Sequence, residues 1–117
     1  MVKYYVILNE KLVNVSEGFW NDWIHGPDAH LKLRETHLIK WTGPVWGRVV
    51  TFFTGCDSCP GSDEPYLWET RLFGAAPFEV WRYTSPEQAR SRHDRYVNLV
   101  VGMLKKSGIE LEKVEIV

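Results

Sequence analysis

The sequence predicts an α+β fold in which residues 1–117 form a single domain. Short runs of β-branched and aromatic residues, separated by turn residues, fill the N-terminal part of the chain. A long amphipathic helical pattern follows them. We therefore expect a mostly antiparallel sheet of six or seven strands, a long C-terminal helix packed on one face, and a short N-terminal helix. A chain of this length is large enough for one hydrophobic core and not for two.

The N-terminal part predicts a hairpin followed by a short helix. Residues 3–8 (KYYVIL) and 11–15 (KLVNV) have the composition of strands, and the two residues between them suit a tight turn. Ser16 is the expected N-cap of a helix over residues 16–25, and Gly26-Pro27 ends it. This helix carries an aromatic face that packs on the sheet or faces a partner.

Two strands and a loop are expected in the middle of the chain. Residues 30–41 alternate apolar and polar side chains only roughly, which predicts a strand with an irregularity near Glu35-Thr36. Residues 45–54 (VWGRVVTFFT) have the β-branched and aromatic density of a buried strand. Residues 55–65 (GCDSCPGSDEP) are turn-forming throughout and predict the longest loop.

Two further strands, residues 66–73 and 78–84, precede the long helix. Ser85 is its expected N-cap, because the hydroxyl accepts a hydrogen bond from an otherwise unpaired N–H, and Gln88 completes a capping box. A last strand, residues 109–117, has the alternating Glu and Lys typical of a sheet edge. The apolar stripe of the helix recurs at three- and four-residue steps: Ala89, His93, Tyr96, Val97, Val100, Met103 and Leu104.

The charge balance argues against general nucleic-acid binding. The net charge is −1, whereas general nucleic-acid binders present a broad cationic face. Four arginines flank the start of the long helix and suit an anionic ligand, although a solvated helix face is the explanation we prefer: Arg82, Arg90, Arg92 and Arg95. No apolar run reaches membrane-spanning length, and the N-terminus lacks a signal-peptide pattern. We expect a cytoplasmic protein that has no membrane partner.

Aromatic residues are unusually abundant, with six Trp, five Tyr and five Phe. At this density they fill a small core, which is the interpretation we favour, or they line a ligand groove or a protein interface. Exposed tryptophans would mark a partner-binding surface. The candidates for that surface are Trp20, Trp23, Trp41 and Trp46.

The sharpest local motif is Cys56-x-x-Cys59. Two thiolates at this spacing bind one zinc ion from a turn, and His25 and His30, or His37, are available as further ligands. A zinc ribbon normally has a second cysteine pair, so we favour two reduced cysteines in a loop over a zinc site. A redox role is weaker still, because a proline and a glycine follow directly and predict a turn in place of a helix N-terminus. We expect no cofactor, with zinc as the alternative.

No catalytic motif stands out. Glu69 and Glu79 lie on adjacent expected strands and could form a carboxylate pair, but ion pairs with Arg71 and Arg82 explain them more economically. His93 on the apolar stripe fits a hydrogen-bonded core histidine better than a catalytic base. We therefore do not expect an enzyme.

Residues 67–97 contain a series of motif positions: Trp68-Glu69-Thr70, Phe73-Gly74, Arg82-Tyr83-Thr84, Glu87, Ala89 and His93. This series resembles the core of small uncharacterised phage and bacterial proteins, whose pattern is W/F-E-T-x-x-F-G followed by R-Y-x-T-x-x-E-A and a helix with a histidine. The chain departs from it at Ala75, where a second glycine is usual, and in the cysteine loop. The resemblance covers about half the chain. It implies a fold and a phage-like origin, and no mechanism.

Two functions from different classes remain. The one we favour is a small, non-enzymatic, phage-derived accessory protein that binds a partner protein, such as a host protein, through an aromatic-rich surface. This function requires no catalytic motif, and none stands out in the sequence. It predicts exposed tryptophans and a homodimer that forms through an edge strand or an aromatic patch. The alternative is a small-ligand- or zinc-binding domain with its site at the loop of Cys56 and Cys59, which predicts a pocket or a bound mass.

Overall fold

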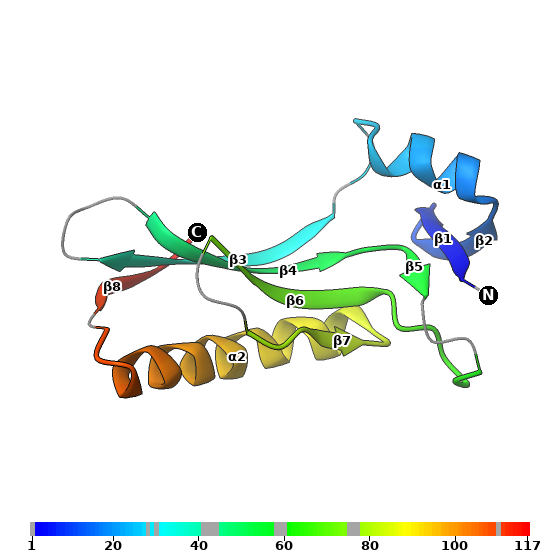
Figure 1. Ribbon diagram of the computed structural model, residues 1–117. Coiled ribbons are helices and arrows are strands. Elements are labelled where there is room, and N and C mark those ends of the chain that lie inside the picture. The colour runs from blue at the N-terminus through cyan, green and yellow to red at the C-terminus, as the bar shows by residue number, and fades with distance from the viewer. Residues whose placement is uncertain are drawn as a thin grey trace.

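The computed structural model describes residues 2–27, 29, 31–40, 45–57, 61–74, 78–109 and 111–117. Its helices are α1 (Glu17–Ile24) and α2 (Pro86–Lys106), and its strands are β1 (Lys3–Leu8), β2 (Lys11–Val15), β3 (Lys32–Lys40), β4 (Val45–Phe53), β5 (Cys56–Asp57), β6 (Trp68–Phe73), β7 (Trp81–Tyr83) and β8 (Leu111–Ile116). The predicted α+β class is confirmed in these residues (Figure 1).

The prediction of one sheet with six or seven strands is wrong. The described strands form two antiparallel sheets, one with the order β2-β1-β5 and one with the order β7-β6-β4-β3-β8. Strand β8 is outermost in the five-stranded sheet, as its charge pattern predicts. The N-terminal hairpin and β5 stay outside the larger sheet.

The smaller sheet is built on the predicted hairpin. Strands β1 and β2 pair from Tyr4 with Val15 to Leu8 with Lys11. The two turn residues have positive φ, 50° at Asn9 and 64° at Glu10, a geometry that suits a two-residue hairpin turn. Strand β5 completes the sheet, so the expectation of a continuous loop over 55–65 is wrong at its start.

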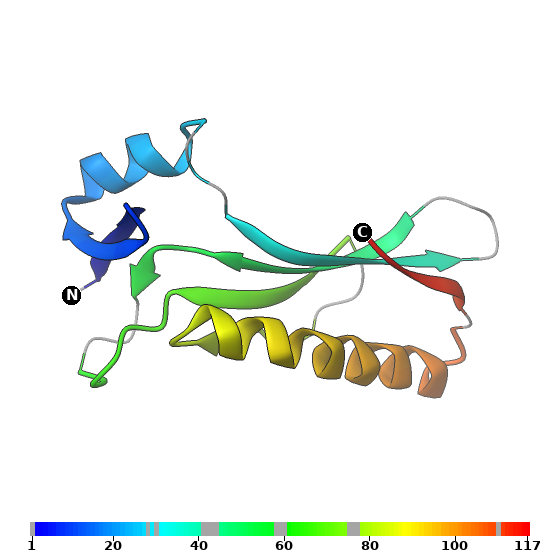
Figure 2. The same cartoon turned by 180° about the vertical axis from the view of Figure 1, so that it is seen from behind.

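Helix α1 follows the hairpin directly. The Ser16 side chain accepts a hydrogen bond from the Phe19 N–H at 3.2 Å, which confirms the predicted N-cap. The helix lies beside β1 and β2 at one end of the larger sheet (Figures 1 and 2). It stands on the side of that sheet opposite α2.

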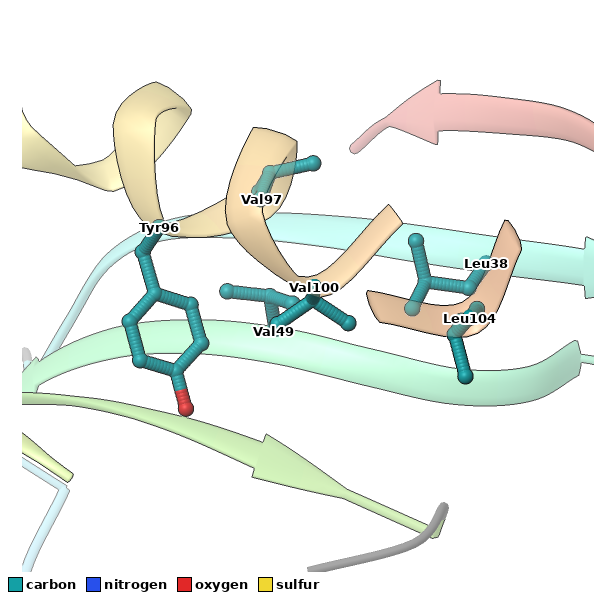
Figure 3. Packing of buried hydrophobic residues seen from close by; sticks show 6 residues of the cluster. All are labelled: Leu38, Val49, Tyr96, Val97, Val100 and Leu104. Carbon is teal, nitrogen blue, oxygen red and sulfur yellow. The ribbon is translucent and has the colours of Figure 1, made fainter. Parts of the chain in front are cut away.

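Helix α2 covers one face of the five-stranded sheet. Ser85 accepts a hydrogen bond from the Gln88 N–H at 3.2 Å, so the predicted N-cap is confirmed. The predicted stripe is confirmed at the residues that are buried: Ala89, His93, Tyr96, Val97, Val100 and Leu104. In Figure 3, Val100 and Leu104 of α2 are turned toward Val49 of β4 and Leu38 of β3. This contact forms the core between helix and sheet.

A buried hydrogen-bond chain crosses this core. His93 on α2 contacts Thr36 on β3 through Nε2 at 2.8 Å and Thr51 on β4 through Nδ1 at 2.7 Å. Thr51 contacts Thr70 at 2.6 Å, and Thr70 contacts the Tyr83 hydroxyl at 2.8 Å. Burial lowers the pKa of His93. The interpretation of His93 as a hydrogen-bonded core residue is confirmed.

The predicted irregularity of β3 at Glu35-Thr36 is wrong in position. The register with β4 shifts between Lys32 and Arg34 and again between Leu38 and Ile39. Regular pairing between these shifts keeps Thr36 on the buried face, where it contacts His93.

The second face of the five-stranded sheet is open, since neither described helix covers most of it (Figures 1 and 2). Side chains alternate between the faces of a strand, so the neighbours of the buried threonines point to the open face. The residues placed there on β4 and β6 are Arg48, Val50, Phe52, Glu69, Arg71 and Phe73. Neither described helix has the length and apolar character needed to cross a membrane.

Candidate binding cleft

A cleft of about 520 Å³ lies where α1 stands over the open face of the larger sheet. Its apolar lining comes from three parts of the chain, and includes Trp20, Ile24, Leu31, Phe52 and Phe73. The same lining contains the polar groups of Glu69, Arg71 and Cys56. The cleft is therefore mostly apolar with a few polar and charged groups, the usual composition of a binding site.

Two phenylalanines form the sheet side of the cleft. Phe52 on β4 and Phe73 on β6 have ring centroids 6.2 Å apart. The Phe73 side chain is 37% exposed, and the Arg48 guanidinium lies 5.9 Å from its ring centroid. This aromatic surface is open to contact on one side and supported by the sheet on the other.

Trp20 forms the helix side of the cleft and is held by a hydrogen bond. Its indole N–H donates to the Thr54 carbonyl oxygen at 3.0 Å, and its ring lies 4.9 Å from that of Tyr4. The neighbouring Gly55 has φ +68°, and an added Cβ would lie 2.6 Å from the Trp20 indole nitrogen. The close approach of chain and indole requires a glycine here.

Glu69 is a buried carboxylate shared by two arginines. Glu69 is 8% exposed, and its carboxylate oxygens accept hydrogen bonds from the Arg71 Nε–H at 2.7 Å and from the Arg82 Nε–H at 3.2 Å. The prediction of ion pairs with Arg71 and Arg82 is therefore confirmed for Glu69. Glu79 is not the cross-strand partner of Glu69, which is Arg82, and it accepts from the Trp81 indole at 3.0 Å.

The thiol of Cys56 borders the cleft and is half-buried. Burial raises the pKa of this thiol, and the carboxylates of Glu69 and Asp57 raise it further. The protonated thiol is a poor nucleophile and has to lose its proton to bind a metal. Cys56 thus contributes a half-buried thiol to the lining of the cleft.

The predicted zinc ligands are only partly described. Cys56 lines the cleft, whereas His25 ends α1 with its Nδ1–H donating to the Asn21 carbonyl oxygen at 2.8 Å. Cys59 and His30 lie outside the described residues. Within the described ranges, no three His, Cys, Asp or Glu side chains gather closely enough to hold a metal ion. The remaining candidate, His37, pairs with Glu35 on β3.

The four predicted tryptophans are placed differently. Trp20 lines the cleft, but Trp23 packs edge-on against Phe53 with centroids 6.0 Å apart. Trp41 lies outside the described residues, and for Trp46 only its backbone position in β4 is described. The lining of the cleft thus contains one of the predicted partner-binding tryptophans, Trp20, and one of the predicted zinc ligands, Cys56.

The predicted partner-binding residues and zinc ligands do not include three residues of the cleft lining, Phe52, Phe73 and Arg71. Their position could have been predicted from the alternation of side chains along β4 and β6, which places them on the face opposite Thr51 and Thr70. Whether that face is open depends on where α2 packs, and this is a long-range property.

Comparison with known proteins gives no independent assignment. No protein-family model, curated protein or solved structure matches this chain. The resemblance to small phage and bacterial proteins therefore stays a prediction, and the geometry of the cleft is the ground for inferring a function.

Proposed function

We propose that this is a small non-enzymatic binding protein whose partner protein inserts an apolar side chain into the cleft between α1 and the open sheet face. The observation that carries the proposal is the cleft of about 520 Å³ beside the exposed ring of Phe73. Apolar pockets flanked by aromatic and arginine side chains are where interfaces concentrate their binding energy. The phage-like origin and the cytoplasmic location remain part of this proposal on sequence grounds alone.

The polar groups of the cleft support binding over catalysis. Glu69 accepts hydrogen bonds from two guanidiniums, which occupy the oxygens that a general base would use. The thiol of Cys56 has a raised pKa, which opposes formation of a nucleophilic thiolate. These groups suit recognition of a partner better than proton transfer.

The test uses peptides as surrogates for the partner. A library of random peptides displayed on phage is selected against the folded protein, and enriched peptides are mapped by ¹⁵N chemical shifts, with the Trp20 indole N–H as a reporter inside the cleft. We expect the shifts to cluster at Trp20, Phe52 and Phe73. Peptides that map elsewhere, or a selection that enriches none, would overturn the proposal.

A matched pair of variants assigns the binding to the cleft. Phe73→Ser removes an apolar side chain that is 37% exposed, and Leu99→Ser removes one that is 47% exposed on α2, away from the cleft. We expect Phe73→Ser to weaken peptide binding by about 30-fold, because interface anchors contribute about 2 kcal/mol. Leu99→Ser should leave the affinity unchanged. Equal effects of the two changes would contradict the assignment.

The alternative function, a small-ligand or zinc site, is favoured by one observation. Cys56, the described member of the cysteine pair, lines the cleft in place of facing open solvent. A ligand held there would contact the thiol and the aromatic rings together. A mass increment on the isolated protein would distinguish this alternative from binding of a partner protein.

A further inference from the structure

Exposed arginines gather beside the cleft, on a chain whose net charge is −1. Arg71 and Arg82 share the single carboxylate of Glu69, and both arginine side chains are 42% exposed. Their hydrogen bonds to Glu69 use the Nε–H groups, and each guanidinium has four further N–H donors on its Nη atoms. One carboxylate therefore holds two guanidiniums in place and leaves N–H donors of both for a further acceptor.

Arg48 extends the cationic surface across the sheet. It lies opposite Phe73 in the register of β4 and β6, with its guanidinium near the Phe73 ring. Arg48, Arg71 and Arg82 thus lie on the open sheet face around Phe73 and Glu69, while the carboxylate of Asp57 lies near the Cys56 part of the cleft. The nearby acidic residue on β3, Glu35, is paired with Lys32 at 3.6 Å and with His37 in its own strand, and the charge of Arg48 also acts on it.

Guanidinium groups that are held in place by a buried acid bind external carboxylates well, because their planar N–H donors match two carboxylate oxygens. Arg71 is itself part of the cleft wall next to Phe52 and Phe73. A partner side chain in the cleft would therefore bring its sequence neighbours close to Arg71. An acidic residue beside a large apolar one fits both halves of this surface.

We infer that the partner presents an acidic segment, in which an aspartate or glutamate adjoins the aromatic or aliphatic residue that enters the cleft, and that Arg71, Arg82 and Arg48 bind that carboxylate. This inference rests on the proposed function and specifies the chemistry of the partner. A protein carboxylate is a better occupant than a nucleic-acid phosphate, because the lining is mainly apolar and Glu69 lies among the cations. The binding energy is then divided between apolar burial and charge-assisted hydrogen bonds.

The first test reads the composition of the peptides that bind in the cleft. We expect the enriched sequences to carry Asp or Glu within two residues of an aromatic or large aliphatic residue. In a synthetic peptide of this kind, changing the acid to its amide should weaken binding about tenfold, as loss of a charge-assisted hydrogen bond does. This comparison alters the peptide alone and leaves the protein intact.

The second test is a double-mutant cycle between the peptide acid and Arg71→Gln. The variant should lower the affinity for the acidic peptide about tenfold and have little effect on the amide peptide. Because Arg71 also pairs with Glu69, Arg48→Gln serves as a second variant that leaves the Glu69 contacts intact, and Arg90→Gln on the exposed side of α2 is the control. Circular dichroism checks that each variant is folded.

The outcomes separate the inference from the proposed function. If no peptide maps to the cleft, both are overturned. If peptides bind in the cleft but are neutral, or do not respond to Arg71→Gln and Arg48→Gln, the carboxylate inference is overturned and the binding function stands. If a phosphoserine peptide binds more tightly than its glutamate counterpart and inorganic phosphate competes with it, the surface recognises phosphate, which also overturns the inference.

Discussion

His93 of α2 and Thr36 of β3 are joined by a buried hydrogen bond of 2.8 Å between Nε2 and Oγ1. The other ring nitrogen of His93 contacts Thr51 on the neighbouring strand. A neutral imidazole has one donor and one acceptor nitrogen, and a hydroxyl can serve as the partner of either. The pair therefore fixes α2 over the sheet face that the cleft does not use.

Removing the central hydroxyl of this network should destabilise the fold. In Thr51→Val the ring of His93 and the hydroxyl of Thr70 each lose a buried partner. We expect the free energy of unfolding to fall by about 1–3 kcal/mol, the penalty for buried polar groups left unpaired. Urea denaturation measures it, with the half-buried Thr84→Val as a control of similar volume change. A loss no larger than that of the control would mean that the network contributes little.

The pH dependence of stability should report His93. Burial lowers its pKa below the ordinary value of 6.5, and the neighbouring Asp94 and Arg34 oppose each other, the first raising the pKa and the second lowering it. The unfolded chain therefore takes up a proton as the pH falls below 6.5 while the folded protein does not. Above pH 6.5 the neutral His93 makes its whole contribution to the free energy of unfolding. Below pH 6.5 the free energy of unfolding falls by up to about 1.4 kcal/mol per pH unit, until the pH reaches the pKa of His93 in the folded protein.

Denaturation at pH 7.5 and at pH 5.5 tests this dependence. Wild-type protein should be less stable at the lower pH, and His93→Gln, which lacks the titrating ring, should show a smaller difference between the two. If the variant keeps the full pH dependence, another group causes it. The carboxylate of Glu35 does not interfere at these pH values, because its pKa is lowered by the hydrogen bond from His37 and its stabilising effect is lost only as the pH falls below 4.5.

Gly55 should be intolerant of a side chain. It has φ +68°, and a Cβ would collide with the Tyr5 carbonyl oxygen and the Trp20 indole nitrogen. Gly55→Ala should therefore cost about 1–3 kcal/mol in stability and disturb the Trp20 wall of the cleft. Gly102→Ala in α2 has open space around its Cβ and should be neutral or stabilising by up to about 1 kcal/mol. Thermal unfolding of the two variants would contradict this account if their effects were equal.

The elements with local signals could be predicted from the sequence, and the assembly of the sheets could not. The hairpin, both N-caps and the stripe of α2 depend on residues that are neighbours in the chain. Strand β5 has two residues, too few for a period, and it is ordered by pairing with Lys3 and Tyr4 more than fifty residues earlier. Sorting the eight strands of the described residues into two sheets likewise depends on contacts between residues far apart in the chain.

The cleft illustrates the same limit. The alternation along β4 and β6 is enough to place Phe52 and Phe73 on one face, and the ion pairs of Glu69 follow from pairing its strand with that of Arg82. The contribution of α1 to the cleft depends on contacts with residues that are distant in the sequence. Trp20 reaches the cleft through its hydrogen bond to Thr54, a residue 34 positions away, which no pattern in the sequence encodes.

Purified protein should carry no zinc. We expect native mass spectrometry on protein prepared without chelators to give the apo mass, because a single cysteine pair is a weak zinc signal and the pKa of Cys56 is raised. An increment of one zinc ion that is lost on denaturation would contradict this expectation, and Cys59→Ser would then be the variant to compare with wild type. A mass two hydrogens light would indicate a disulfide.

Strand β8 should mediate self-association. It is hydrogen-bonded to β3 on one side and is outermost in the five-stranded sheet, and Ile116 is 78% exposed. Sedimentation velocity should therefore detect a dimer that grows with protein concentration, and Ile116→Lys should shift it to monomer, because a charge opposes edge pairing. Leu99→Lys on α2 is the control at an exposed apolar position. A wild-type protein that stays monomeric would refute the dimer, whereas a dimer that survives Ile116→Lys would move the interface to the aromatic cleft.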